Sequence, residues 1–555
     1  MVYGRGIVKI LEKSKIFLAG AISATLVTGA VTAYTSSMKK TITVDYNNIK
    51  INVDGKAIEP KDGNGKSVEP FIYEGTTYLP VRAVSQALGK RVTWDGDTKT
   101  VNILSGMTES NMPKKKLSVW IMPNSAHPDY DFEEVAMPFF IDNPDFGLDI
   151  TVMDWGSAWT KITAAATAGD APDITQLGTT WVGAISYLDA LVDLSGYINK
   201  DDFLPQTLRA SRVEGSSQMT AAPWFAETRA LYYRTDACEK ARVDPTKDFE
   251  TWDSFKAALK KLKNVEINGK KLSALGMPGK YDWNVVHNYA PWVYGAGGSF
   301  LNSNFTKSTF SSQETFEGIK FYSELANEGL IDKKSLELNT SDIESKFAFY
   351  GEYATSILGP WNIGSLENYK QEFEADPSEG NDLLDRVGVA MLPAGPKGRG
   401  GFLGGSTLSV FRSSKNQDKA IELIKFLTGK EAQIEYCKMT GNLPVVKAAY
   451  DDPWIAENPM RKVFKAQMEY AVHYPSIPTW GPIETYLQEG LSEVWDNVMG
   501  YEGKYSAEKT MKILEEADEK INIILETGPE YINGYIDDFD DYIDDIDIDS
   551  DNNLR

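Results

Sequence analysis

Aromatic rings stand beside carboxylate or hydroxyl side chains in several short segments of this sequence. The segment "MDWGSAW" holds Asp154 and Trp155, and the segment "GTTW" holds Thr179 and Trp181. Flat rings pack against apolar C–H faces, while ionised carboxylates accept short hydrogen bonds from hydroxyl groups. Together they suit a ring with hydroxyls at its rim, such as a pyranose. For Trp155 the alternative is that its ring only closes the surface of its own domain.

A third segment, "APWFAETRALYYRTD", combines aromatic rings with Glu227 and Arg229. An arginine donates two hydrogen bonds at once, and a glutamate accepts them from hydroxyls, so this pair suits recognition of a polyhydroxylated ligand. A salt bridge between Glu227 and Arg229 at a hinge explains the same residues equally well. Both alternatives stay open.

Three further segments contribute candidate binding residues. In "GKYDWNVVHNYAPWVYGAGG" we expect Trp283 to face a ligand and Trp292 to be buried, because a helix through this segment buries one face. Gly405, in "GGS", lets the backbone approach a ligand or a hinge closely. Trp480, in "HYPSIPTWGPIE", either contacts ligand or only packs.

Composition describes a globular chain of several domains. Its 555 residues are enough for three or four domain-sized units, and 42% hydrophobic with 25% charged residues is ordinary globular usage. The net charge of −22 argues against sequence-independent binding of nucleic acid or anionic lipid.

Cysteine and histidine usage predicts no metal site and no cofactor. Cys238 and Cys437 are the two cysteines, and we expect two buried thiols, with one disulfide as the alternative. The three histidines, at 127, 287 and 473, form no metal-binding pattern.

Strand and helix patterns alternate after residue 117. "FGLDITVMDW" and "APDITQLG" read as strands, "SAWTKITAAATAG" reads as a helix between them, and Thr251 is placed to cap the helix "TWDSFKAALKKLK". This alternation predicts an α/β fold with a mostly parallel sheet. Ligands of such sheets gather at the carboxyl ends of the strands, where the candidate residues lie.

Segment boundaries follow from composition. Residues 1–40 read as a signal peptide or membrane anchor, because basic residues precede the uncharged run 16–34. Cleavage and retention of this run both stay open, and either places the rest of the chain outside the cytoplasm. Residues 41–104 form a compact unit, 105–116 a linker, 117–527 the main body, and 528–555 an acidic tail.

The small unit 41–104 resembles the copper amine oxidase N-terminal-like, or stalk, domain of bacterial surface proteins. The resemblance rests on "FIYEGTTYLPVRAVSQALG" and "VTWDGDTKTV". It implies a spacer or a contact with the cell envelope. It implies no oxidase chemistry, because residues 41–104 contain no histidine.

The main body resembles the extracellular solute-binding proteins of carbohydrate ABC importers. Six segments match in order: "AGDAPDITQLG", "APWFAETRALYYRTD", "TWDSFKAALKKL", "GPWNIG", "GGSTLSVFRSSKNQDKAIELIKFL" and "TGNLPV". The resemblance implies two α/β lobes with a hinge and a cleft between them, roughly 117–224 with 408–437 and 229–405 with 443–527. It also implies that Trp361, in "GPW", stacks on a sugar.

The function that this resemblance implies is that of a receptor without enzymatic activity. It captures a sugar or oligosaccharide by lobe closure and delivers it to the permease subunits of an ABC importer. The alternatives are a surface glycan-binding scaffold that is not coupled to import, and a glycan-processing enzyme with two carboxylates about 5–9.5 Å apart.

Overall fold

The computed structural model describes residues 43–53, 56–60, 67–73, 75–88, 90–95, 100–104, 115–280, 282, 284–375, 377–378, 380–501 and 503–528. The chain divides into two compact units at Lys114 and Lys115. The expected signal or anchor 1–40, most of the expected linker 105–116 and the tail from 529 onward lie outside the described residues.

The first unit is built from short antiparallel strand pairs and one helix. The pairs are β1 (Ile51–Val53) with β2 (Lys56–Ile58), β3 (Phe71–Tyr73) with β4 (Thr76–Tyr78), and β5 (Arg91–Asp95) with β6 (Thr100–Leu104). Helix α1 (Val81–Ala87) follows β4, and β5 pairs with β6 as an antiparallel hairpin. The rings of Phe71 and Tyr78 stack with centroids 5.2 Å apart.

The second unit contains a large sheet at one end. Its strands are β7 (Lys115–Ile121), β8 (Phe146–Val152), β9 (Ile174–Gly178), β10 (Ala222–Glu227), β17 (Gly401–Val410), β18 (Leu443–Pro444) and β19 (Ala471–His473), in the order β18-β10-β17-β9-β7-β8, with β19 beside β17. The sheet is less parallel than expected, because β17 pairs antiparallel with both β9 and β10. Strands β9 and β10 consequently run in the same direction on either side of β17, and β7 and β8 are parallel to β9. The carboxyl ends of β7, β8, β9 and β10 therefore lie at one common edge of the sheet.

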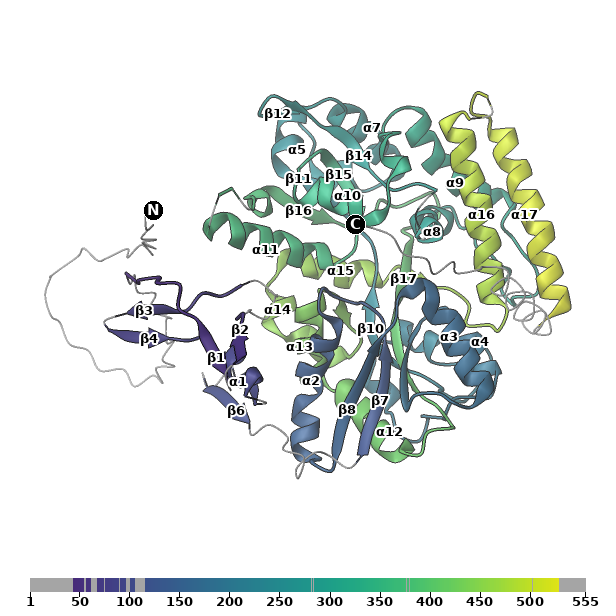
Figure 1. Ribbon diagram of the computed structural model, residues 1–555. Helices are drawn as coiled ribbons and strands as arrows, with labels where there is room; N and C mark the ends of the chain where they lie inside the picture. The colour runs from purple at the N-terminus through teal and green to yellow at the C-terminus, as the bar shows by residue number, and fades with distance from the viewer. Residues whose placement is uncertain are drawn as a thin grey trace, which may run out of the picture. The chain divides into compact units, whose positions relative to one another are not determined.

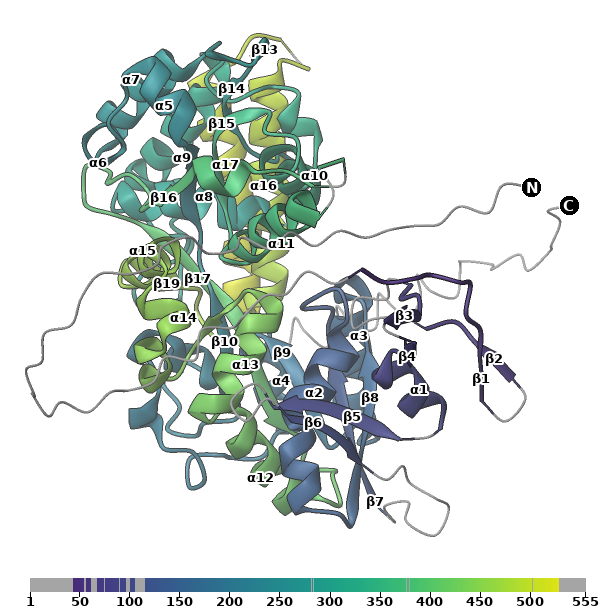
Figure 2. The ribbon, with the colours of Figure 1, turned by 90° about the vertical axis from the view of Figure 1, so that its left-hand side faces the viewer.

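A smaller sheet lies at the other end of the second unit (Figure 2). Its order is β14 (Ser273–Gly276), β15 (Tyr353–Leu358), β11 (Ala230–Arg234) and β16 (Val387–Ala390). Tyr232 and Tyr233 lie in β11, so the stretch after Arg229 enters this second sheet. The hairpin β12 (Glu266–Ile267) with β13 (Lys270–Lys271) is added at its margin.

Helices cover both sheets (Figure 1). Those near the large sheet are α2 (Pro128–Asp142), α3 (Trp155–Ala168), α4 (Val182–Tyr187), α12 (Gln417–Leu427) and α13 (Lys430–Thr440). Those of the smaller-sheet end are α5 (Thr235–Ala241), α6 (Pro245–Asp248), α7 (Trp252–Leu262), α8 (Val285–Gly295), α9 (Gln313–Asn327), α10 (Thr340–Ala348), α11 (Trp361–Ala375), α16 (Trp480–Met499) and α17 (Ala507–Thr527). Helices α14 (Pro453–Ala456) and α15 (Pro459–Met468) follow β18. Thr251 caps α7 in a capping box with Ser254, as predicted.

The chain passes between the two sheets where β10 leads into β11 and where β16 leads into β17. The first passage is short, because only Thr228 and Arg229 separate Glu227 from Ala230. The boundary expected near residue 405 is displaced, since the whole of β17 from Gly401 belongs to the large sheet. Strand β17 pairs with β10 from Gly404 to Leu408.

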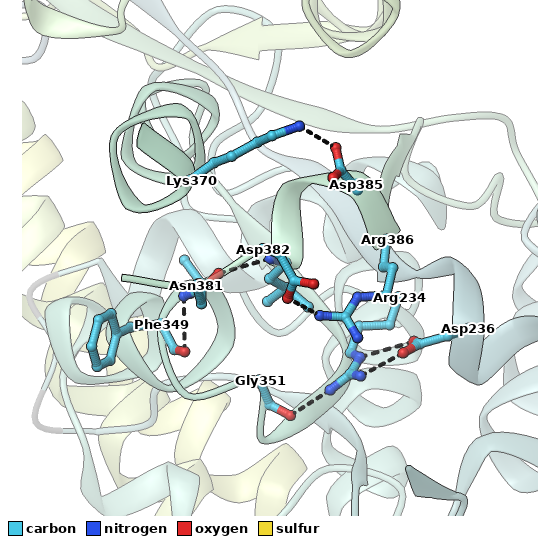
Figure 3. Close-up of polar contacts among 11 residues, drawn as sticks. Arg234, Asp236, Phe349, Gly351, Lys370, Asn381, Asp382, Asp385 and Arg386 are labelled. Atoms are coloured by element: carbon cyan, nitrogen blue, oxygen red, sulfur yellow. Dashed lines mark hydrogen bonds and ion pairs between the residues drawn. The ribbon is translucent and has the colours of Figure 1, made fainter. Parts of the chain in front are cut away.

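Two separate sets of ionic contacts lie beside the smaller sheet (Figure 3). At the end of β11, Arg234 donates two hydrogen bonds to Asp236, at 3.0 and 2.6 Å, and one to the carbonyl of Gly351 at 2.8 Å. Lys370, on α11, pairs at 2.5 Å with Asp385, which lies in the 3-10 turn Leu383–Arg386. The Lys370–Asp385 pair links α11, the helix whose first residue is Trp361, to the turn that precedes β16.

In the part of the chain that the structure describes, no helix combines the length and the apolar content that crossing a bilayer requires. The apolar run 16–34 lies outside that part.

Candidate ligand-binding site

Three adjacent strands of the large sheet bring predicted site residues together. Glu227, the last residue of β10, pairs with Gly404 of β17, and Gly405 pairs with Ala226. On the other side of β17, the backbone N–H of Thr179 donates to the carbonyl of Gly405 at 3.2 Å. Thr179, Glu227 and Gly405 therefore lie at the common edge where β9 and β10 end.

Gly405 is required by the backbone of this edge. Its φ is +129°, a conformation that other residues rarely adopt, and a Cβ atom there would lie 2.1 Å from the carbonyl oxygen of Phe225. The sequence predicted a close backbone approach at Gly405. The approach that the structure shows is to the neighbouring strand.

A polar cluster beside this edge was not predicted. Gln176, buried in β9, donates to the hydroxyl of Ser406 at 2.7 Å and to the amide oxygen of Asn124 at 3.0 Å. Asn124 in turn donates to the hydroxyl of Tyr436 at 2.9 Å. The available signal was a glutamine inside the apolar strand "DITQL", since a buried amide needs hydrogen-bond partners.

Three tryptophans form an aromatic cluster at the end of β9. The Trp181 ring lies 5.5 Å from that of Trp155 and 5.7 Å from that of Trp159, centroid to centroid, and all three side chains are half-buried. A Cβ at Gly178 would lie 3.5 Å from the Trp155 ring, in ordinary van der Waals contact, so the rings pack closely over the end of the strand. Half-exposed rings at a strand end are suited to contact an apolar ligand face.

Asp154 begins helix α3 as its N-cap. One carboxylate oxygen accepts from the N–H of Gly156 at 2.8 Å, and the residue is exposed. A capping carboxylate satisfies a backbone donor at the helix start. The structure thus gives Asp154 a structural task, and its predicted contact with ligand stays a prediction.

Arg229 is surrounded by partners at the passage between the sheets. It forms an ion pair with Glu227 at 3.1 Å and donates to the amide oxygen of Asn284 at 3.2 Å. Its guanidinium carbon lies 4.9 Å from the centre of the Trp361 ring. Of the two alternatives left open by the sequence, the salt bridge is the one that the structure shows.

Trp361 begins helix α11 and is half-buried. Its indole N–H donates to Oε1 of Glu344 at 2.6 Å, and the amide of Asn362 donates to the same oxygen at 2.9 Å. Burial raises the pKa of the Glu344 carboxyl, while these two donors and the nearby Arg229 act in the opposite direction. The sequence analysis did not single out Glu344, because nothing in its helix "TSDIESKFA" marks it.

The start of α11 also meets the end of α13, which belongs to the large-sheet end. Gly441 closes α13 with a φ of +74°, and a Cβ there would lie 2.5 Å from the Cα of Trp361. Trp361 is therefore the point where residues from both ends of the second unit come together.

Comparison with known proteins decides the family. Residues 134–463 match the family model described as bacterial extracellular solute-binding protein. The chain belongs to this family. Residues 21–103 and 53–122 match the copper amine oxidase N-terminal domain, which confirms the resemblance stated for the small N-terminal unit.

This solute-binding protein is 29% identical over 370 residues to a binding protein of Brucella abortus, covering 66% of this chain and 84% of the relative. It is 23% identical over 398 residues to the maltotriose-binding protein of Pyrococcus abyssi, covering 70% and 79%. The sugar-binding protein MalE from Xanthomonas citri matches its structure with a TM-score of 0.62 at 22% identity, covering 76% of this chain and 99% of that one. The likeness confirms the two-lobed α/β fold.

The predictions for three tryptophans have different outcomes in this solute-binding protein. Trp480 is fully buried and stacks on Tyr474 with centroids 4.8 Å apart, so the structure gives it a packing role, and we do not retain it as a ligand contact. One turn along α16, burial raises the pKa of Glu484 to about 7. Trp292 is buried as predicted, whereas Trp283 lies outside the described residues.

Both cysteines are free and buried, as expected, and burial raises the pKa of each thiol. Among the residues that the structure describes, no group of three or more His, Cys, Asp or Glu side chains is placed to hold a metal ion.

Proposed function

We propose that this protein captures a carbohydrate, in the first place an oligosaccharide, outside the cytoplasm and delivers it unaltered to the permease subunits of an ABC importer. The observation that carries the proposal is the meeting of Trp361 with residues from both lobes, next to Glu227 and Arg229. A ligand that touches Trp361 from between the lobes stabilises their closed arrangement over an open one.

The chemistry of these residues favours a neutral, hydroxyl-rich ligand. The Trp155, Trp159 and Trp181 cluster and Trp361 supply flat rings, and Glu227 supplies an acceptor for hydroxyl donors. A second carboxylate, Glu344, lies nearby on the indole N–H of Trp361. Arg229, the cation that the structure places on the Trp361 ring, is already paired with Glu227. The negative charge of a phosphorylated or otherwise anionic solute would be repelled by these carboxylates. The maltotriose-binding relative is consistent with this class of ligand.

A thermal-shift panel with the full chain tests the proposal. The panel contains maltotriose, other oligosaccharides of differing linkage and monosaccharides, with glycerol 3-phosphate and amino acids as non-carbohydrate controls. A sugar at 100 times its Kd adds about 2.7 kcal/mol to the unfolding free energy, which raises the Tm. We expect one group of oligosaccharides to do so. A panel in which only an anionic solute or an amino acid stabilises the chain would overturn the proposal.

We further propose that segment 1–40 exports the chain and that the N-terminal unit acts as a spacer at the cell envelope. The match of this unit to the copper amine oxidase N-terminal domain supports the spacer role. Fractionation of cells that express the full chain tests it. Recovery of the protein from the cytoplasm would contradict it, and retention on membranes against release into the medium distinguishes anchor from cleaved signal.

A further inference from the structure

Glu344 is a partly buried carboxylate that accepts hydrogen bonds from the first two residues of helix α11. It lies on α10, and its Oε1 accepts from the Trp361 indole N–H at 2.6 Å and from the Asn362 amide at 2.9 Å. Placing a carboxylate in a largely apolar surrounding costs free energy unless donors compensate for the lost water. One of the two compensating donors is Trp361, the residue that the proposed function places against the sugar.

Contacts on several sides fix the Trp361 ring. Arg229 lies on the ring at 4.9 Å from its centre, and Glu344 holds its N–H edge. The ring also folds back over Gly359, because a Cβ there would lie 2.3 Å from the ring carbon Cη2. Gly441 packs directly against the Trp361 Cα, because a Cβ on Gly441 would lie 2.5 Å from that atom. The ring therefore has one orientation in the folded chain.

We propose that Glu344 is a positioning residue that holds the Trp361 indole by its N–H, so that one face of the ring lies against Arg229 and the other is presented to the carbohydrate. Glu344 acts through Trp361 and has no direct contact with ligand in this account. The presentation of a face to carbohydrate rests on the proposed function, whereas the fixing of the ring does not.

A fixed ring helps binding because its freedom has already been lost on folding. Ordering a side chain at the moment of binding costs about 0.5–1.5 kcal/mol, which corresponds to roughly 2–10-fold in affinity. Loss of the Glu344 carboxylate should therefore weaken carbohydrate binding by that factor and leave the fold intact. Glu344→Gln keeps an acceptor oxygen for the indole N–H, so this variant should retain most of the wild-type affinity.

The first experiment reads the ring directly and needs no ligand. The full chain is labelled with 15N at the indole nitrogens of its 13 tryptophans, and Trp361→Phe assigns the Trp361 signal by its disappearance. In wild-type protein and in Glu344→Gln we expect this indole proton to exchange slowly with solvent. In Glu344→Ala it should exchange fast and shift. Glu374→Gln is the matched control. It changes an exposed carboxylate on α11, the helix of Trp361, and should leave the indole signal unchanged.

The second experiment measures maltotriose binding in a double-mutant cycle. Glu344→Ala should weaken binding about 2–10-fold in the wild-type background and not at all in the Trp361→Phe background. An unchanged indole signal in Glu344→Ala overturns the positioning role. So does an equal loss of affinity in both backgrounds. Absence of maltotriose binding to wild-type protein counts against the proposed function alone, because the indole experiment still decides whether Glu344 fixes the ring.

Discussion

The guanidinium of Arg229 and the ring of Trp361 face each other at 4.9 Å, although Arg229 lies in the passage between the sheets and Trp361 begins a helix far along the chain. Arg229 also holds Glu227 at 3.1 Å, and its side chain is only 4% exposed. A guanidinium on an aromatic face is a favourable arrangement, more so when it is shielded from water. The passage between the lobes and the aromatic candidate for ligand contact are thus one physical unit.

Arg229→Lys should disrupt this unit while keeping the charge. A lysine has no planar fork, so it cannot stack on Trp361 and bond both Glu227 and Asn284. We expect a loss of about 1–3 kcal/mol in the unfolding free energy, measured by urea denaturation. Arg212→Lys, at an exposed position, is the control and should stay within about 0.5 kcal/mol. Equal stability of the two variants would show that Arg229 is not an energetic link.

Trp361→Ala and Trp480→Ala should separate binding from folding. Trp361 is half-buried, and its loss should weaken oligosaccharide binding at least about tenfold, or 1.4 kcal/mol, with a smaller effect on stability. Trp480 is fully buried, and its loss should cost about 3–5 kcal/mol of unfolding free energy. Calorimetric titration and chemical denaturation of both variants check this. Equal losses of binding and stability in Trp361→Ala would assign Trp361 to the core.

Gly441→Ala should be more harmful than Gly169→Ala. Both glycines close a helix with positive φ, at +74° and +69°, so both variants carry the backbone strain of about 1 kcal/mol. Only at Gly441 does a Cβ meet another atom, the Trp361 Cα at 2.5 Å, whereas at Gly169 nothing lies within 4 Å. We expect Gly441→Ala to lose stability beyond that of Gly169→Ala and to weaken sugar binding. Indistinguishable melting curves would contradict the contact.

Glu484 should make stability fall as pH rises. Its pKa is raised by burial from 4.5 to about 7, so the folded chain holds this proton more tightly than the unfolded chain. The resulting stability is fully present below pH 4.5 and is lost as pH rises through about 7. Relative to Glu484→Gln, wild-type protein should lose on the order of 2 kcal/mol over this window. Glu493→Gln, an exposed change on the same helix, should follow the wild-type curve.

Local patterns predicted what depends on near neighbours in the chain. The strand that ends before Trp181 and the capping of α7 by Thr251 are both encoded within a few residues. Glycine at 405 was also recognised as a position of close backbone approach. These features place the candidate residues at the correct edge of the sheet.

Contacts between distant segments could not be predicted in this way. Glu344 gained its importance from an indole on another helix, and Gln176 from a serine and an asparagine on other segments. The burial of Trp480 depends on the packing of Tyr474, and the reversed direction of β17 depends on the return of the chain from the other sheet. The residues next to a position in the sequence do not indicate which distant residues will contact it in the fold.

The most direct test of the central claim is a calorimetric titration of the full chain and of Trp361→Ala with the oligosaccharide that raises the Tm most. The account predicts one binding site with a Kd near micromolar, about −8 kcal/mol. It also predicts recovery of the sugar uncleaved and at least about tenfold weaker binding by the variant. Absence of binding by every oligosaccharide, cleavage of the sugar, or equal affinity of the two proteins would contradict it.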